Sequence, residues 1–162
     1  MSSVQESASP PSRRRRILKK ALLIAAGVVV VAGIAVQFVP VKGIGTNPPA
    51  RYKLDAPPEV EAILRTSCFD CHSNETKWPF YARIAPPSWL MARDVLKGRS
   101  RMNMSEWGDV DEDERALDRE NAWDQIEEGE MPPWFYLPLH PSARLSDSEK
   151  ATLKSWLLAK KK

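Results

Sequence analysis

The stretch Cys68-Phe69-Asp70-Cys71-His72 constrains this chain more than any other, because it holds both cysteines and one of the two histidines. The spacing Cys-x-x-Cys-His is typical of covalent haem attachment: two thiols bond to the vinyl groups, and the adjacent imidazole ligates the iron. Random placement of these residues would give the pattern on the order of once in several thousand chains. We therefore predict a covalent haem c, held by Cys68 and Cys71, with its iron bound by His72.

Three other uses of the cysteines compete with this interpretation. A disulfide would close a small, strained loop of two intervening residues. A redox-active Cys-x-x-Cys belongs in a strand-to-helix context, and no β-rich run precedes Cys68. A zinc site would need Cys68, Cys71, His72 and His140 together, although Cys71 and His72 are neighbours and the usual second close pair is absent.

The residues before the motif predict a membrane anchor. Residues 1–20 form a basic tail, and residues 21–39 are apolar except for Gln37. A helix of this length spans about 30 Å, the thickness of the hydrocarbon core. Because basic residues lie before the apolar run, the tail is expected in the cytoplasm. The protein would then cross the inner (cytoplasmic) membrane once, with the residues after the helix forming a periplasmic, extracytoplasmic domain. Gly33-Ile34-Ala35 also suits a signal peptidase, so a cleaved signal segment is the alternative.

The segment that follows is predicted to be a linker. Residues 40–58 contain five prolines and two glycines, a composition typical of an extended spacer. The haem domain is then expected over residues 59–162. Six of the 24 basic residues and one of the 21 acidic residues precede position 42, which leaves 18 basic and 20 acidic residues in the remainder. This balance argues against nucleic-acid binding.

Helical signals recur through residues 59–162, so we predict an all-α, cytochrome c-like fold around one haem. Pro57-Pro58-Glu59 begins a helix that leads to Cys68, with Val60, Ile63 and Leu64 on one face. Further helices are predicted over 88–97, over 115–128 ending at Gly129, and after Ser146, where Glu149 completes a capping box. The last of these is expected to pack across the helix leading to Cys68.

Aromatic and basic residues between the first two predicted helices suggest contacts with the haem. Trp78 to Tyr81 and Trp89 offer large apolar surfaces that suit a porphyrin wall, with ordinary core packing as the alternative. Trp89, Ala92, Val95 and Leu96 are expected to point inward. Lys97, Arg99 and Arg101 could pair with haem propionates, although a solvated charge cluster is the more common arrangement.

A second ligand to the iron is predicted in Gly129-Glu130-Met131-Pro132-Pro133-Trp134. The thioether of Met131 is a soft ligand for low-spin iron, and the two prolines stiffen the backbone that holds it. Met131 also lies 59 residues beyond His72, enough for the chain to reach the opposite face of a haem. Met102, Met104 and His140 are alternative ligands, and a methionine that only fills the core is the simplest alternative.

Several short runs together resemble one known family. Cys71-His72-Ser73-Asn74-Glu75-Thr76 with Trp78-Pro79, Ala85-Pro86 with Ser88-Trp89, Gly98-Arg99, and Asn103 with Ser105-Glu106-Trp107 resemble the bacterial haem-binding domain family of small exported proteins. The resemblance covers roughly residues 49–158. It implies covalent haem at Cys68 and Cys71 with His72 as proximal ligand and, by analogy with the wider cytochrome c class, Met131 as distal ligand. It implies no particular partner.

The expected function is one-electron transfer by a membrane-anchored monohaem c-type cytochrome. Its expected partner is a redox protein of the periplasm or membrane. Iron with six ligands leaves no position for a substrate, so we do not expect an enzyme. A haem-based sensor or a peroxidase-like protein, with an open distal position, is the alternative. A third possibility is a membrane-anchored interaction module without haem.

Overall fold

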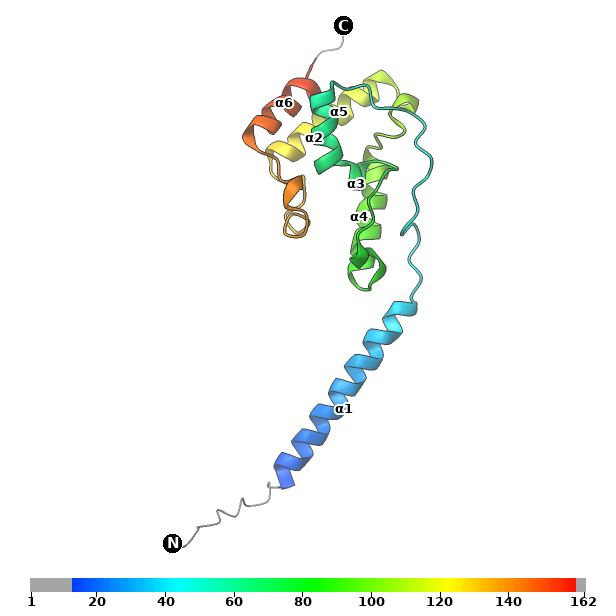
Figure 1. Ribbon diagram of the computed structural model, residues 1–162, viewed down its shortest axis with the longest axis vertical. Helices are drawn as coiled ribbons and strands as arrows, with labels where there is room; N and C mark the ends of the chain where they lie inside the picture. The colour runs from blue at the N-terminus through cyan, green and yellow to red at the C-terminus, as the bar shows by residue number, and fades with distance from the viewer. Residues whose placement is uncertain (1–12, 160–162) are drawn as a thin grey trace, which may run out of the picture. The chain divides into compact units, whose positions relative to one another are not determined.

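The computed structural model describes residues 13–159. The chain divides into two compact units, and the boundary in the sequence lies between Pro40 and Val41. Within the described residues every regular element is helical (Figure 1). The prediction of an all-α chain with one long apolar helix near its N-terminus is therefore confirmed.

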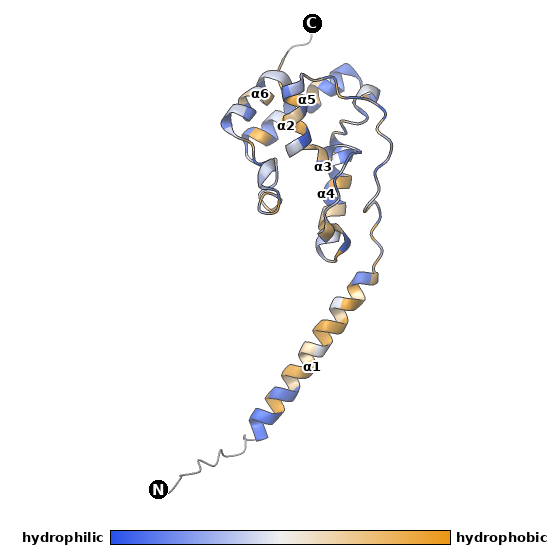
Figure 2. Cartoon of the chain, in the orientation of Figure 1, coloured by the Kyte–Doolittle hydropathy of each residue, from blue (hydrophilic) through white to orange (hydrophobic). Residues whose placement is uncertain are grey.

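The first unit contains a single long helix. Helix α1 runs over Arg13–Ala35 and continues as the 3-10 turn η1, Val36–Phe38. Its apolar side chains are exposed along its whole length, and its most apolar window has a mean hydropathy of 2.5 (Figure 2). At 1.5 Å per residue this helix exceeds the roughly 30 Å needed to cross a bilayer core. Among the described residues it is the one helix with the length and composition of a membrane span.

The second unit contains the remaining helices, connected by long irregular segments. The α-helices are α2 (Pro58–Ser67), α3 (Phe69–His72), α4 (Pro87–Arg101), α5 (Glu112–Glu127) and α6 (Asp147–Leu157). Short 3-10 turns lie between them: η2 (Phe80–Arg83), η3 (Trp107–Asp109) and η4 (Pro141–Ala143). Helix α6 packs on α2 and α5, which confirms that the C-terminal helix crosses the helix leading to Cys68 (Figure 1).

Two clusters of buried side chains form the core. The larger lies where α2, α5 and α6 meet and contains Leu54, Val60, Leu64, Phe69, Met104, Trp107, Trp123, Ile126, Leu145, Leu153 and Leu157. The smaller lies between α4 and η2 and contains Ala82, Met91 and Val95. Cys71, Trp78 and Tyr81 pack against it. The helical turn that carries the cysteines therefore joins the two clusters, because Phe69 lies in one and Cys71 borders the other.

The predicted helix boundaries agree closely with the structure at both ends of the domain. Helix α2 begins at Pro58 and buries Val60 and Leu64. The capping box at α6 is present, since the Ser146 side chain accepts from the Glu149 backbone N–H and Glu149 accepts from the Ser146 N–H. Local chemistry determined these ends, because each is fixed by residues within one turn.

Helix α4 differs from its prediction in extent and orientation. It ends at Arg101 and does not stop at Gly98, which is buried within it. Ala92 and Val95 are buried as expected, but Trp89 and Leu96 are exposed by 37% and 46%. The inward face of α4 is thus centred on Ala92, Val95 and Gly98.

Gly98 is where α4 approaches the cysteine-bearing turn most closely. A Cβ atom at this position would lie 2.5 Å from the Cys71 carbonyl oxygen, and backbone cannot yield as a flexible side chain can. We expect Gly98→Ala to destabilise the domain by about 1–3 kcal/mol, as overpacking does elsewhere. Chemical unfolding followed by circular dichroism measures this. Lys97→Ala, on the exposed side of the same helix, is the control. Equal stability of both variants would contradict the close packing.

The predicted linker is extended, but much of it is bound to the domain. The Arg51 and Tyr52 N–H groups donate to the Ser105 carbonyl at 3.0 and 3.1 Å, and Leu54 is buried in the larger core cluster. Asn74 donates to the Pro49 carbonyl at 3.2 Å. The second unit accordingly begins at Val41 and includes most of the segment that we predicted as a spacer.

Candidate haem site

Two successive helices bring Cys68, Cys71 and His72 together. Cys68 ends α2 by donating its N–H to the Leu64 carbonyl at 2.8 Å, and its own carbonyl accepts from the N–H groups of Cys71 and His72 at 3.1 and 2.9 Å. Residues three and four positions apart in a helical turn share one face. Phe69, exposed by 5%, anchors this turn in the larger core cluster.

Both cysteines are free, half-buried thiols. Burial raises the pKa of Cys68 to about 12, and burial together with the Asp70 carboxylate raises the pKa of Cys71 to about 12. The two groups are therefore uncharged S–H groups at neutral pH. The disulfide alternative is not realised in this structure. Residues 13–159 also contain no group of three or more potential ligands of the His, Cys, Asp and Glu types, so the zinc alternative has no site there.

His72 is held in the state that a metal ligand requires. Its Nδ1 lies 3.0 Å from the Met102 carbonyl oxygen, which can only accept, so Nδ1 carries the proton. The His72 carbonyl in turn accepts from the Met104 N–H at 2.8 Å. Burial lowers the pKa of His72 below its ordinary value, which favours the neutral ring. The proton on Nδ1 places the lone pair on Nε2, the atom through which many histidines bind a metal. Hydrogen bonding to the Met102 and Gly98 carbonyls opposes the effect of burial on the pKa of His72 only in part.

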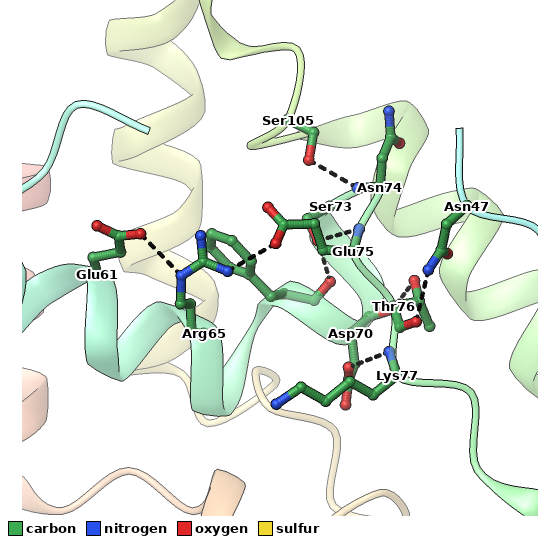
Figure 3. Close-up of polar contacts among 11 residues, drawn as sticks. Asn47, Glu61, Arg65, Asp70, Ser73, Asn74, Glu75, Thr76, Lys77 and Ser105 are labelled. Atoms are coloured by element: carbon green, nitrogen blue, oxygen red, sulfur yellow. Dashed lines mark hydrogen bonds and ion pairs between the residues drawn. The ribbon is translucent and has the colours of Figure 1, made fainter. Parts of the chain in front are cut away.

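The chain leaves the motif through a tightly bonded turn over residues 73–77 (Figure 3). The Ser73 hydroxyl donates to the Phe69 carbonyl at 2.8 Å and accepts from the Glu75 N–H at 2.9 Å. Thr76 donates to the Asp70 carbonyl, also at 2.8 Å. These bonds tie the turn back to the helix that holds the cysteines, so the motif is rigid on both sides.

Arg99 supports this turn. Its Nε donates to the Ser73 carbonyl at 2.8 Å, and Nη2 donates to Asn47 Oδ1 and Thr76 Oγ1, each at 2.9 Å. Nη1 donates to the Thr46 carbonyl at 3.3 Å. Arg99 thus joins α4, the linker and the turn, and its pairing with a haem propionate stays a prediction.

Met131 lies just beyond the C-terminus of α5, in a segment of residues 129–140 that we name the Met131 loop. Gly129 has a φ of +78°, and the N–H groups of Gly129 and Glu130 donate to the carbonyls of Ile126 and Gln125. This is a Schellman motif, for which glycine is favoured. The Met131 N–H also donates to the Gln125 carbonyl at 3.0 Å, while its side chain is 36% exposed. Met131 is thus fixed at its backbone, while the residue as a whole is partly exposed.

The alternative ligands are occupied elsewhere. Met104 is 3% exposed and belongs to the larger core cluster. The Met102 carbonyl faces Nδ1 of His72, and Met102 packs against the same core cluster. His140 stacks on Tyr136 with ring centroids 3.9 Å apart, and Nε2 lies 3.2 Å from the Tyr81 hydroxyl.

The structure also brings the Met131 loop onto the motif, through a residue that the sequence did not indicate. Tyr136 donates its hydroxyl to Asp70 Oδ2 at 2.8 Å, and Asp70 lies between the two cysteines. Burial and the Asp70 carboxylate raise the pKa of Tyr136, so the phenol remains a donor. A lone tyrosine 66 residues from its partner carries no sequence signal of such a contact.

The η2 region and the Met131 loop each expose large apolar side chains. Phe80 and Ile84 from the η2 region are 80% and 47% exposed, and Trp134 and Leu139 from the Met131 loop are 79% and 67% exposed. The two regions lie side by side, because Tyr81 contacts His140. Large apolar groups exposed together mark binding surfaces. Trp78, in contrast, is half-buried and donates to Asn47 at 3.1 Å, and so serves the fold.

Comparison with known proteins agrees with these observations. The model of the haem-binding domain family matches residues 31–159, most of the chain. The chain belongs to this family. The matched range of the haem-binding domain begins within α1 and includes the linker, which the structure likewise joins to the domain. Comparisons with curated proteins and with solved structures gave no match.

Proposed function

We propose that this haem-binding protein is a membrane-anchored monohaem c-type cytochrome that transfers one electron at a time. The observation that carries the proposal is the state of His72, whose protonated Nδ1 faces the Met102 carbonyl and whose Nε2 carries the lone pair, in a motif with two free thiols. The haem, when bound, supplies an iron that alternates between the ferric and ferrous states.

Each residue of the site has a distinct role in this proposal. Cys68 and Cys71 would hold the haem through thioether bonds, and His72 would be the proximal ligand of its iron. Met131 would be the distal ligand. The exposure of the residue and its bonded backbone, together with the contact between its loop and Asp70, favour it over Met102, Met104 and His140.

The membrane arrangement follows from α1 and its flanks. Four arginines and two lysines lie at its N-terminal end, and Lys42 is the first basic residue after the apolar run. The positive-inside rule then assigns the N-terminus to the cytoplasm and residues 41–162 to the periplasmic side of the inner membrane. A redox partner in the periplasm or membrane would meet the domain there.

Carbon monoxide binding and a redox titration test the function. For a six-ligand electron carrier we expect a reversible one-electron titration of the purified full-length protein, and slow, weak binding of carbon monoxide by its reduced form. The Met131→Ala variant, which lacks the proposed distal ligand, shows how carbon monoxide binds when that position is open. Prompt, tight binding by the unmodified protein would instead indicate the open distal position of a sensor or a peroxidase-like protein.

A further inference from the structure

The Met131 loop is fastened to the motif through the Asp70 carboxylate. Asp70 Oδ1 accepts from the Lys77 N–H at 2.9 Å, which fixes the carboxylate against its own turn (Figure 3). Oδ2 is thereby directed to the Tyr136 hydroxyl at 2.8 Å. A hydrogen bond to an ionised group is roughly twice as strong as one between neutral groups. This bond joins the loop to the segment between the two cysteines.

A second contact fastens the same loop to η2. The His140 ring lies nearly parallel to that of Tyr136, at 6°, and Nδ1 is 3.2 Å from the Tyr136 carbonyl oxygen. A proton on Nδ1 serves this carbonyl, and Nε2 then accepts from the Tyr81 hydroxyl at 3.2 Å. One tautomer of His140 therefore makes both hydrogen bonds. The bond from Tyr81 holds the stacked rings of His140 and Tyr136 against η2.

Met131 lies between two fixed points of the chain. On one side, the Gln125 carbonyl at the end of α5 accepts from the Met131 N–H. On the other side, five residues later, Tyr136 is bound to Asp70. Loss of the Tyr136 bond would leave the second point held only through His140 and Tyr81, with the first point intact. The loop that carries Met131 would then be less restrained, without any change in Met131 itself or in the core.

We propose that Tyr136, supported by His140 and Tyr81, is a latch that positions Met131 and sets how readily its loop opens to expose the distal side of the haem. The inference rests on the proposed function, because it takes Met131 as the distal ligand. Tyr136 touches neither cysteine sulfur nor the His72 ring in the contacts described above, so it is a positioning residue.

Binding of imidazole to the ferric, haem-loaded, full-length protein tests the latch, because an external ligand must displace the methionine. Tyr136→Phe removes the hydroxyl and keeps the ring. We expect imidazole to bind Tyr136→Phe about tenfold more tightly or better, since the bond to a charged acceptor no longer opposes loop opening. The thioether-to-iron charge-transfer band should weaken in the same variant.

Tyr52→Phe is a matched control. Tyr52 donates to Asp109 at 2.8 Å, the same length as the Tyr136 bond, but this contact joins the linker to η3. We expect its imidazole affinity to equal that of the unmodified protein. Tyr81→Phe, which breaks only the second contact, should increase the affinity by a smaller factor than Tyr136→Phe.

The outcomes separate the latch from the function. If Met131→Ala abolishes the charge-transfer band while Tyr136→Phe binds imidazole as Tyr52→Phe does, the latch is wrong and the electron-carrier proposal stands. If Met131→Ala leaves the band unchanged, the ligand assignment fails, and the latch fails with it. Tighter imidazole binding by Tyr136→Phe and, by a smaller factor, by Tyr81→Phe supports the latch, provided that Tyr52→Phe binds as the unmodified protein does and the far-ultraviolet spectra are unchanged.

Discussion

Alanine at both Cys68 and Cys71 is expected to give protein without covalently bound haem. The two thiols are free and lie on one face of the turn that begins at α3, so each is available for its own thioether bond. With both removed, only the coordination bonds of His72 and Met131 would remain, and coordination bonds do not survive denaturation. Single variants should retain one thioether.

Intact mass after expression with a c-type maturation system measures this result. The unmodified protein should have the mass of the chain plus one haem, and the double variant the mass of the chain alone. The same spectrum shows whether residues 1–35 remain attached, which distinguishes the anchor from a cleaved signal segment. Thr66→Ala, on the exposed side of α2, is the control. If the unmodified protein lacked the mass of a haem, covalent attachment would be wrong, and the cysteines would have to form a disulfide, a redox-active pair or a metal site instead.

Met131→Ala is expected to abolish the thioether-to-iron charge-transfer band of the ferric protein and to lower its reduction potential. Methionine ligation raises the potential relative to harder ligands, and axial ligands set haem potentials over a range of about 0.8 V. We expect a decrease on the order of 0.1 V or more. Spectroscopy and a redox titration of the full-length protein measure the two effects.

Met102→Leu and Met104→Leu are the controls for this assignment. Met104 is buried in the core, and Met102 packs against the same cluster, so both variants should keep the band. Leucine conserves the volume of the side chain, which keeps the cost in stability below about 1.5 kcal/mol. Loss of the band in either leucine variant, with Met131→Ala unchanged, would transfer the distal role to that methionine.

The sequence by itself was sufficient wherever a structural feature depends on residues close together in the chain. Four features are determined by residues within one or two helical turns: the Cys-x-x-Cys-His spacing, the proline at the start of α2, the Ser146 capping box and Gly129 at the end of α5. The length and apolar composition of α1 are local properties as well. These features required no knowledge of which segments meet.

The tertiary structure decided the features that depend on contacts between distant segments. Packing against Cys71 turned Ala92, Val95 and Gly98 inward and left Trp89 and Leu96 exposed, although all are acceptable on one helix face. Arg99 became a support for the turn after His72 because the linker and that turn surround its guanidinium group. Met102 supplies a carbonyl to His72, and Tyr136 reaches Asp70 across 66 residues. A backbone carbonyl and a single tyrosine hydroxyl carry no periodicity or spacing, so only the packed chain shows which group each of them meets.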